Sequence, residues 1–193
     1  MRRVLPLVIA VALMTGGTLG MILTAAYLRP VARSGPAVVG GGMDAMFIEQ
    51  MIPHHDDAIE MAELALTRAE HPEIKQLAED IKRTQTAENT QMRTWYREWF
   101  DATVPDVGRS SQMMGGMMGS RGTDMDDLEV AESFDKAFIE AMIPHHQMGI
   151  MMSQMAGSRT GRPEIRGLTS SIIEGQSREI DKMQAWYAEW YGR

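Results

Sequence analysis

Two pairs of adjacent histidines are the side chains in this sequence best suited to metal chemistry. Each pair ends the same five-residue motif, Met-Ile-Pro-His-His, at residues 51–55 and again at residues 142–146. Imidazole is a ligand for copper, zinc, iron and nickel, whereas thioether sulfur selects Cu(I). On a helix, a methionine three or four residues before a histidine lies on the same face. The motif therefore predicts sites at which imidazole and thioether ligands share a metal ion.

The wider use of methionine favours copper over harder ions. The 193 residues include 19 methionines and no cysteine, which excludes disulfides and thiolate metal sites. Around the second histidine pair, three positions that are Asp, Glu and Leu in the first copy become Met148, Met151 and Met155. The second copy should therefore prefer Cu(I), and the first could accept Cu(II) or another divalent ion. The candidate ligands are His54, His55, Met51, Met61, His145, His146, Met142, Met148 and Met152.

Methionine also has structural uses that compete with metal binding. A single methionine on a buried helix face more often fills the core than binds an ion, because its flexible side chain packs well. Met113, Met114, Met117 and Met118 differ, since they lie beside glycines in a stretch rich in Gly, Ser and Asp. Two interpretations of these four residues stay open: a loose Cu(I) shuttle site, or a poorly packed hydrophobic loop.

The histidine motifs belong to an internal duplication with a constant offset of 91 residues. Residues 44–62 and 135–153 are identical at 11 of 19 positions, and the match continues without a gap to a Trp-Tyr-x-x-Trp segment near the end of each copy. Apolar residues recur at three- and four-residue spacing, which indicates helices with one buried face. Pro72 and Pro163 suit the first turn of a second helix in each copy.

Each copy is therefore predicted to be a helical hairpin, and two hairpins bury their apolar faces most simply as an antiparallel four-helix bundle. The predicted bundle spans residues 43–193. Its parts are repeat one at 43–100, a Met-rich linker at 101–127 and repeat two at 128–193. The fold class is all-α. A proline inside each first helix, directly before the histidines, is interpreted as a device that aims the imidazoles.

Four polar residues fall on the predicted buried faces of the second helices: Gln85, Glu88, Gln176 and Glu179. A hairpin turn centred near residue 70 would place His55 level with Gln85, and Met51 level with Glu88. Buried polar groups need partners. One use for these four is to orient a metal-bound imidazole through its second ring nitrogen, outside the first shell of ligands.

The N-terminal segment predicts export. Val4–Leu28 carries no charge, follows two arginines and is long enough to cross a hydrocarbon core of ~30 Å. Residues 1–33 are interpreted as a signal anchor with a transmembrane helix, and residues 34–42 as a linker. The alternative is a signal peptide cleaved after Ala26. The protein is thus expected outside the cytoplasm, tethered to the membrane, or secreted or periplasmic after cleavage.

Charge argues against a nucleic-acid partner. The chain after residue 33 holds 15 basic and 26 acidic residues, a net charge of −11, whereas phosphate backbones attract basic surfaces. Metal ions, the membrane and a copper-delivery protein whose identity the sequence does not give are the expected partners.

With its duplicated histidine helix, the chain resembles the bacterial family defined by domain of unknown function 305. The family pattern, F-x-x-x-M-x-x-H-H-x-x-A-I-x-M, falls on residues 47–61 and again on 138–152, where Gly149 replaces the alanine. The resemblance covers nearly all of residues 43–193. It implies a ferritin-like four-helix fold and, from the characterised CopM-like members, an exported copper binder linked to copper resistance.

Together these observations predict an exported copper-binding protein that acts in copper sequestration, trafficking or resistance, with Cu(I) favoured and Cu(II) as the second state. An enzyme is not expected. Ferritin-like di-iron sites need Glu-x-x-His pairs, and none occurs in the sequence. A haem-binding or other metal-binding bundle of the cell envelope, and a metal-free helical interaction module, are the alternatives.

Overall fold

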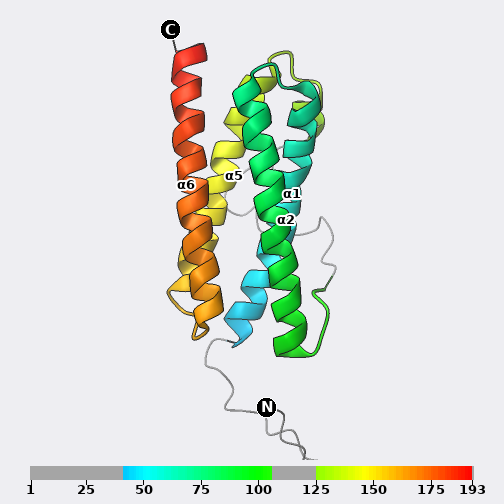
Figure 1. The fold of residues 1–193 in the computed structure, drawn as a ribbon, viewed down its shortest axis with the longest axis vertical. Helices are drawn as coiled ribbons and strands as arrows, with labels where there is room; N and C mark the ends of the chain where they lie inside the picture. Colours follow the sequence, from blue (N-terminus) through cyan, green and yellow to red (C-terminus); the bar gives the residue numbers. More distant parts are fainter. Residues whose placement is uncertain (1–40, 106–124, 193) are drawn as a thin grey trace, which may run out of the picture. The chain divides into compact units, whose positions relative to one another are not determined.

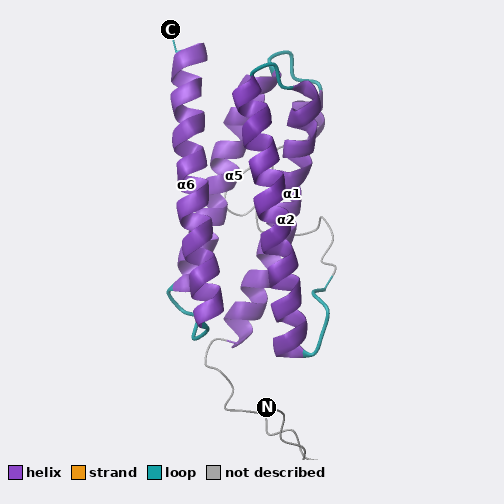
Figure 2. Cartoon of the chain, in the orientation of Figure 1, coloured by secondary structure: helices purple, strands orange, loops and turns teal. Residues whose placement is uncertain are grey.

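The computed structural model describes residues 41–105 and 125–192, and within these ranges it contains helices and connecting loops with no strand (Figure 2). The described residues belong to one compact unit. The prediction of an all-α fold is confirmed. The helices are α1 (Gly41–Arg68), α2 (Pro72–Phe100), α4 (Met125–Glu129), α5 (Phe134–Gly157) and α6 (Pro163–Tyr191).

The four long helices form two hairpins that lie side by side (Figure 1). Helix α1 packs along α2, helix α5 packs along α6, and the main contact between the hairpins joins α1 to α5. Pro72 and Pro163 begin the second helix of each hairpin, where a proline sacrifices no hydrogen bond of the helix. Helices α1 and α5 both continue through their internal prolines, Pro53 and Pro144.

Contacts between the hairpins show that α1 and α5 run antiparallel. The middle of each helix meets the other where His54 contacts His145. The carboxylate of Asp135, near the start of α5, accepts hydrogen bonds from the turn that follows α1. Asp44, near the start of α1, lies 3.4 Å from Arg162, which follows α5. The two copies are thus related by an approximate twofold arrangement with the histidine motifs at its centre.

The hydrophobic core consists of two clusters with a polar layer between them. The first apolar cluster includes Met61, Ile74, Ile81, Phe138, Met142 and Met183. The second apolar cluster includes Phe47, Ile48, Met51, Met92, Ile165 and Ile172. Along every long helix, the residues between these clusters include a buried polar side chain: His55 on α1, Gln85 on α2, His146 on α5 and Gln176 on α6. We call this zone, with His54 and His145, the histidine layer.

The buried face of α2 differs in detail from the predicted stripe. Glu88 and Trp95 are only half-buried, whereas Asn89 and Tyr96 are buried instead. Their polar atoms explain the choice, because the Asn89 amide donates to Asp56 on α1 at 2.7 Å and the Tyr96 hydroxyl donates to Glu49. Polar partners on α1 therefore fix the rotation of α2 more closely than apolar spacing does.

The short helix α4 lies at the end of the segment that the sequence predicts to be a linker. Leu128 is 2 % exposed and joins the first apolar cluster, and the Arg68 guanidinium donates to the carbonyl oxygen of Ala131. A five-residue helix shows too few turns for its periodicity to be visible in sequence.

Two predicted features lie outside the described residues. They are the N-terminal helix at Val4–Leu28 and the four loop methionines Met113, Met114, Met117 and Met118. Among the helices that the structure describes, none is long and apolar enough to cross a membrane.

Candidate metal centre

His54 and His145 contact each other where α1 crosses α5. Their ring centroids are 3.8 Å apart and the rings are stacked, with an interplanar angle of 30°. Nε2 of His54 lies 3.1 Å from the carbonyl oxygen of His145. Because a carbonyl can only accept, Nε2 carries the proton in this contact, and Nδ1 of the neutral ring keeps a lone pair.

His55 and His146 each face a carboxylate on the second helix of their own hairpin. Nε2 of His55 donates to Glu88 at 2.8 Å, and Nε2 of His146 donates to Glu179 at 2.6 Å. Both imidazoles are fully buried, whereas the two carboxylates reach the surface. A carboxylate on one ring nitrogen fixes the ring orientation and raises the basicity of the other nitrogen. The predicted register was wrong here, because His55 meets Glu88 and not Gln85.

The histidine layer holds an unusual number of buried polar atoms without hydrogen-bond partners among the described residues. They include Nδ1 of all four histidines and Nε2 of His145. The side-chain oxygen of Gln85, both amide atoms of Gln176 and the hydroxyl of Ser153 are in the same condition. Each such group costs about 1–3 kcal/mol when it is buried without a partner. The layer is thus polar, enclosed and poorly satisfied by the protein itself.

The stacked histidines are held in their neutral form. Burial, followed by the nearby His55 and His146, lowers the pKa of His54 to about 3, although its contact with the His145 carbonyl opposes this shift. Burial and the other three histidines also lower the pKa of His145 well below its usual value. At neutral pH both rings therefore offer a lone pair without first losing a proton, as metal binding requires.

The structure places the predicted methionines on both sides of the histidine layer. Met51 is fully buried in the second apolar cluster, and Met142 is fully buried in the first. Met61 also belongs to the first cluster, whereas Met152 packs at the edge of the second. Met148 is partly buried. Thioethers therefore lie on both sides of the histidine layer along the bundle axis. The same side chains also pack the hydrophobic core.

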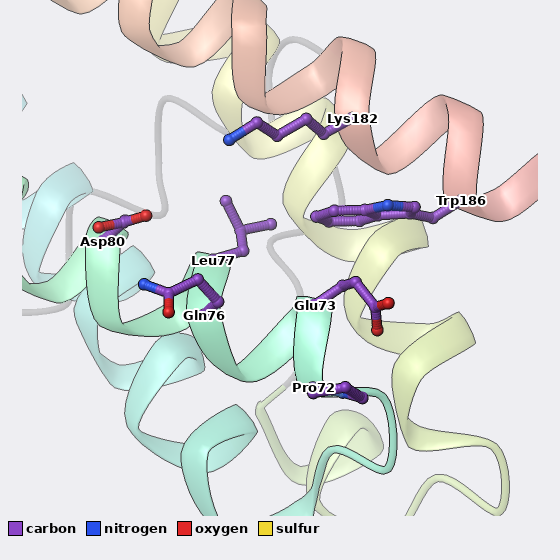
Figure 3. A pocket seen from close by; sticks show the side chains of 7 residues that line it. All are labelled: Pro72, Glu73, Gln76, Leu77, Asp80, Lys182 and Trp186. Carbon is purple, nitrogen blue, oxygen red and sulfur yellow. The ribbon is translucent and has the colours of Figure 1, made fainter.

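Within the part of the chain that the structure describes, no three His, Cys, Asp or Glu side chains are grouped so that they could hold one metal ion. The surface hollow between α2 and α6 is a separate feature, in which Trp186, Leu77 and Lys182 face one another (Figure 3). None of the four layer histidines lines it.

Two further residues of the layer were not identified from the sequence, namely Gly149 and Ser153. Both are buried on α5 close to the histidines. The signal for Gly149 was present in the alignment of the two copies, where it stands opposite Ala58.

Solved structures of similar architecture place this arrangement among known proteins. CopM in its Cu(I)-bound form is 47 % identical, with a TM-score of 0.68, over 77 % of this chain and 98 % of that one. CopM has also been solved in apo, Ag-bound and Cu(II)-bound forms. A putative secreted protein from Streptomyces coelicolor is 27 % identical, with a TM-score of 0.65, over 76 % of this chain and 92 % of its own.

Sequence comparison gives one viral relative and the family. The uncharacterized protein L153 of Acanthamoeba polyphaga mimivirus is 43 % identical over 51 residues, which are 26 % of this chain and about a third (34 %) of the relative's length. The family model described as "Domain of unknown function (DUF305)" matches residues 44–187. That match covers both hairpins and both histidine motifs, and the chain therefore belongs to the DUF305 family.

Proposed function

We propose that this protein binds copper in its histidine layer and acts outside the cytoplasm in copper sequestration, trafficking or resistance. The observation that carries the proposal is the set of buried imidazole nitrogens that lack a partner among the described side chains. The kinship with CopM, which has been solved with Cu(I), Cu(II) and Ag, supports the same choice of metal.

In the proposed site, the carboxylates act on the copper through the histidines. Glu88 and Glu179 would hold His55 and His146 with Nδ1 directed away from the carboxylate, ready to accept an ion. Negative charge at the far nitrogen would also strengthen the bond that Nδ1 makes to a cation. The neutral state of His54 favours loading at ordinary pH.

Thioethers would complete the site. The described His, Asp and Glu side chains do not form a three-ligand group, so in this proposal thioether sulfur supplies the further ligands. Met51, Met61, Met142, Met148 and Met152 are the candidates, and their softness favours Cu(I) over Cu(II). Core packing by the same methionines is compatible with this role, because a thioether can turn toward an ion with little change in volume.

The remaining parts of the proposal follow from the sequence. An N-terminal anchor would keep the bundle at the outer face of the membrane, and the acidic surface would tolerate cations while repelling nucleic acid. In this proposal the protein binds the copper ion and releases it to a delivery partner. No catalytic step is part of the proposal.

The test compares histidine variants of the full chain by Cu(I) competition with a chromophoric chelator. We expect the double variants His54→Gln/His145→Gln and His55→Gln/His146→Gln to lose bound copper. His71→Gln is the matched control, since His71 is the one remaining histidine and lies at the start of α2, with its ring on Asp135.

Circular dichroism on the same samples separates lost ligands from lost fold. Unchanged copper content in both folded double variants would remove the histidine layer from the proposal. If His71→Gln lost as much copper as the double variants, the loss of copper would not be specific to the histidine layer.

A further inference from the structure

The two halves of the histidine layer are not equivalent, and the difference begins at Gly149. In the first copy the same position is Ala58, which is fully buried. A Cβ atom built at Gly149 would lie 2.5 Å from Oε1 of Gln176 and 3.0 Å from Cε1 of His54. The space that an alanine methyl group takes in the first copy is therefore occupied in the second by a carboxamide beside an imidazole.

The amide of Gln176 is placed there without any partner that would account for it. Gln176 is 4 % exposed, and neither its oxygen nor its nitrogen has a hydrogen-bond partner among the described residues. Of Gln85, its counterpart in the first copy, only Oε1 is in that condition. In the first copy the methyl group of Ala58 fills the position that is open at Gly149 in the second copy.

Of the two stacked histidines, His54 is the one beside Gly149 and Gln176. His54 uses Nε2 to bind the carbonyl of His145, which leaves Nδ1 as its one free nitrogen. Neither ring nitrogen of His145 makes a well-formed hydrogen bond within the described chain, although a contact with the backbone of His54 opposes the lowering of the His145 pKa. The half of the layer around His54 thus has a free imidazole nitrogen and an amide oxygen nearby, and the absence of a side chain at Gly149 leaves the space for that oxygen.

We propose that Gly149 admits Gln176 as a specificity-determining residue, whose amide oxygen makes the copper position at His54 harder than the one at His145. Carboxamide oxygen suits harder ions, and thioether suits Cu(I). The protein then holds two unequal positions, of which the one at His54 accepts Cu(II) and the one at His145 retains a preference for Cu(I). This inference rests on the proposed copper function and adds the origin of its ion preference.

Gly149→Ala is the decisive variant because it should fold. The atom in closest conflict, Oε1 of Gln176, ends a flexible side chain, and Cε1 of His54 at 3.0 Å needs to give only slightly. Alanine in place of glycine within a helix gains about 0.5–1 kcal/mol. Gln176→Leu removes the oxygen without altering α5. We expect both variants to weaken Cu(II) binding by the full chain about tenfold, the lower end of the effect of losing a supporting group. Cu(I) affinity should change less than about threefold, because the thioethers that hold it are untouched.

Gln85→Leu is the matched control and should leave the Cu(II) affinity unchanged, because the amide beside Gly149 and His54 is that of Gln176. Ala58→Gly should have the opposite effect and create a second position that accepts Cu(II). Calorimetry gives the affinities, and electron paramagnetic resonance counts the Cu(II) environments.

A copper-free measurement tests the placement of Gln176 separately. The Cε1–H resonance of His54 should shift in Gln176→Leu but stay constant in Gln85→Leu; Gly149→Ala does not serve here, because its methyl group would contact Cε1 directly. Copper binding by the native chain with unchanged Cu(II) affinity in Gly149→Ala and Gln176→Leu would overturn this inference alone. Absence of copper binding by the native chain would overturn the proposed function and, with it, the inference.

Discussion

Asp135 should be worth far more to stability than its counterpart Asp44, although the two occupy the same position in the two copies. The Asp135 carboxylate is 4 % exposed and accepts the backbone N–H groups of Glu70 and His71, the latter at 2.8 Å. It also accepts Nδ1–H of the His71 ring, which stacks on Trp190 at 3.8 Å. It therefore caps the start of α2 from the other hairpin.

The expected cost of Asp135→Ala follows from these bonds. Hydrogen bonds to a charged acceptor contribute about 1.5–3 kcal/mol each, and two of the three donors are main-chain amides that cannot turn elsewhere. The half-exposed His71 ring can be hydrated and adds little. We expect the free energy of unfolding to fall by about 3 kcal/mol or more.

Asp44→Ala should cost much less, because the start of α6 does not depend on Asp44. Neither oxygen of its buried carboxylate has a hydrogen-bond partner among the described residues, and Arg162 lies 3.4 Å away. The backbone N–H of Arg162 donates to the Thr160 hydroxyl instead. The Arg162 guanidinium is also held over the Trp99 ring at 4.1 Å and retains access to water. We expect a loss of about 1 kcal/mol or less, because the carboxylate satisfies no hydrogen-bond donor among the described residues and its removal leaves Arg162 partly exposed to water.

Urea unfolding of the metal-free full chain, followed by circular dichroism, measures both changes. A loss in Asp44→Ala equal to that in Asp135→Ala would refute the reasoning, because the two residues share their burial and differ in the donors that they satisfy. Asp135→Asn should recover part of the loss, since an amide oxygen can still accept one main-chain bond.

Three further predictions concern pH, the tyrosine–glutamate pairs and the methionines. Because His54 and His145 have lowered pKa values in the fold, the unfolded chain binds more protons, so stability of the metal-free protein should fall as the pH is lowered from about 6.5 toward about 3. The urea midpoint at pH 7 and pH 5 checks this. Tyr96→Phe should cost about 1 kcal/mol in thermal unfolding, and Tyr187→Phe less, because the hydroxyl of Tyr187 bonds at the surface. Met142→Leu should change stability by less than about 1.5 kcal/mol while weakening Cu(I) binding, measured by chelator competition.

The features repeated within the sequence were the ones that could be predicted. The duplication, the apolar spacing and the prolines at 72 and 163 are local signals, and they gave two hairpins with the correct second-helix starts. The glutamates were also singled out from the sequence, although the structure places them at the edge of the buried face and not on it. The residue that each glutamate contacts was predicted incorrectly. The prediction compared the heights of residues along the hairpin, whereas a glutamate side chain is long enough to reach most of a helical turn. His55 consequently meets Glu88.

Contacts between the hairpins could not be predicted, because the spacing of residues within one copy does not show how far that hairpin is shifted along the other. The stacking of His54 on His145 and the capping of α2 by Asp135 both depend on that offset. The short helix α4 was not predicted for another reason. It contributes one buried leucine to the core and is too short to show a periodic pattern. Which residues meet across the two hairpins depends on the tertiary structure and not on local sequence patterns.

The histidine layer is a poor device for stability alone. It interrupts a core that is otherwise continuous along the bundle, and its buried nitrogens and oxygens would each be cheaper as apolar groups of the same shape. A ligand that binds only the folded chain repays that cost in proportion to its concentration and affinity. The energetic cost of the layer thus agrees with its proposed role in binding copper. The cost of unsatisfied hydrogen bonds should be large at Gln176 and His145, each of which has two polar side-chain atoms in this condition within the described chain.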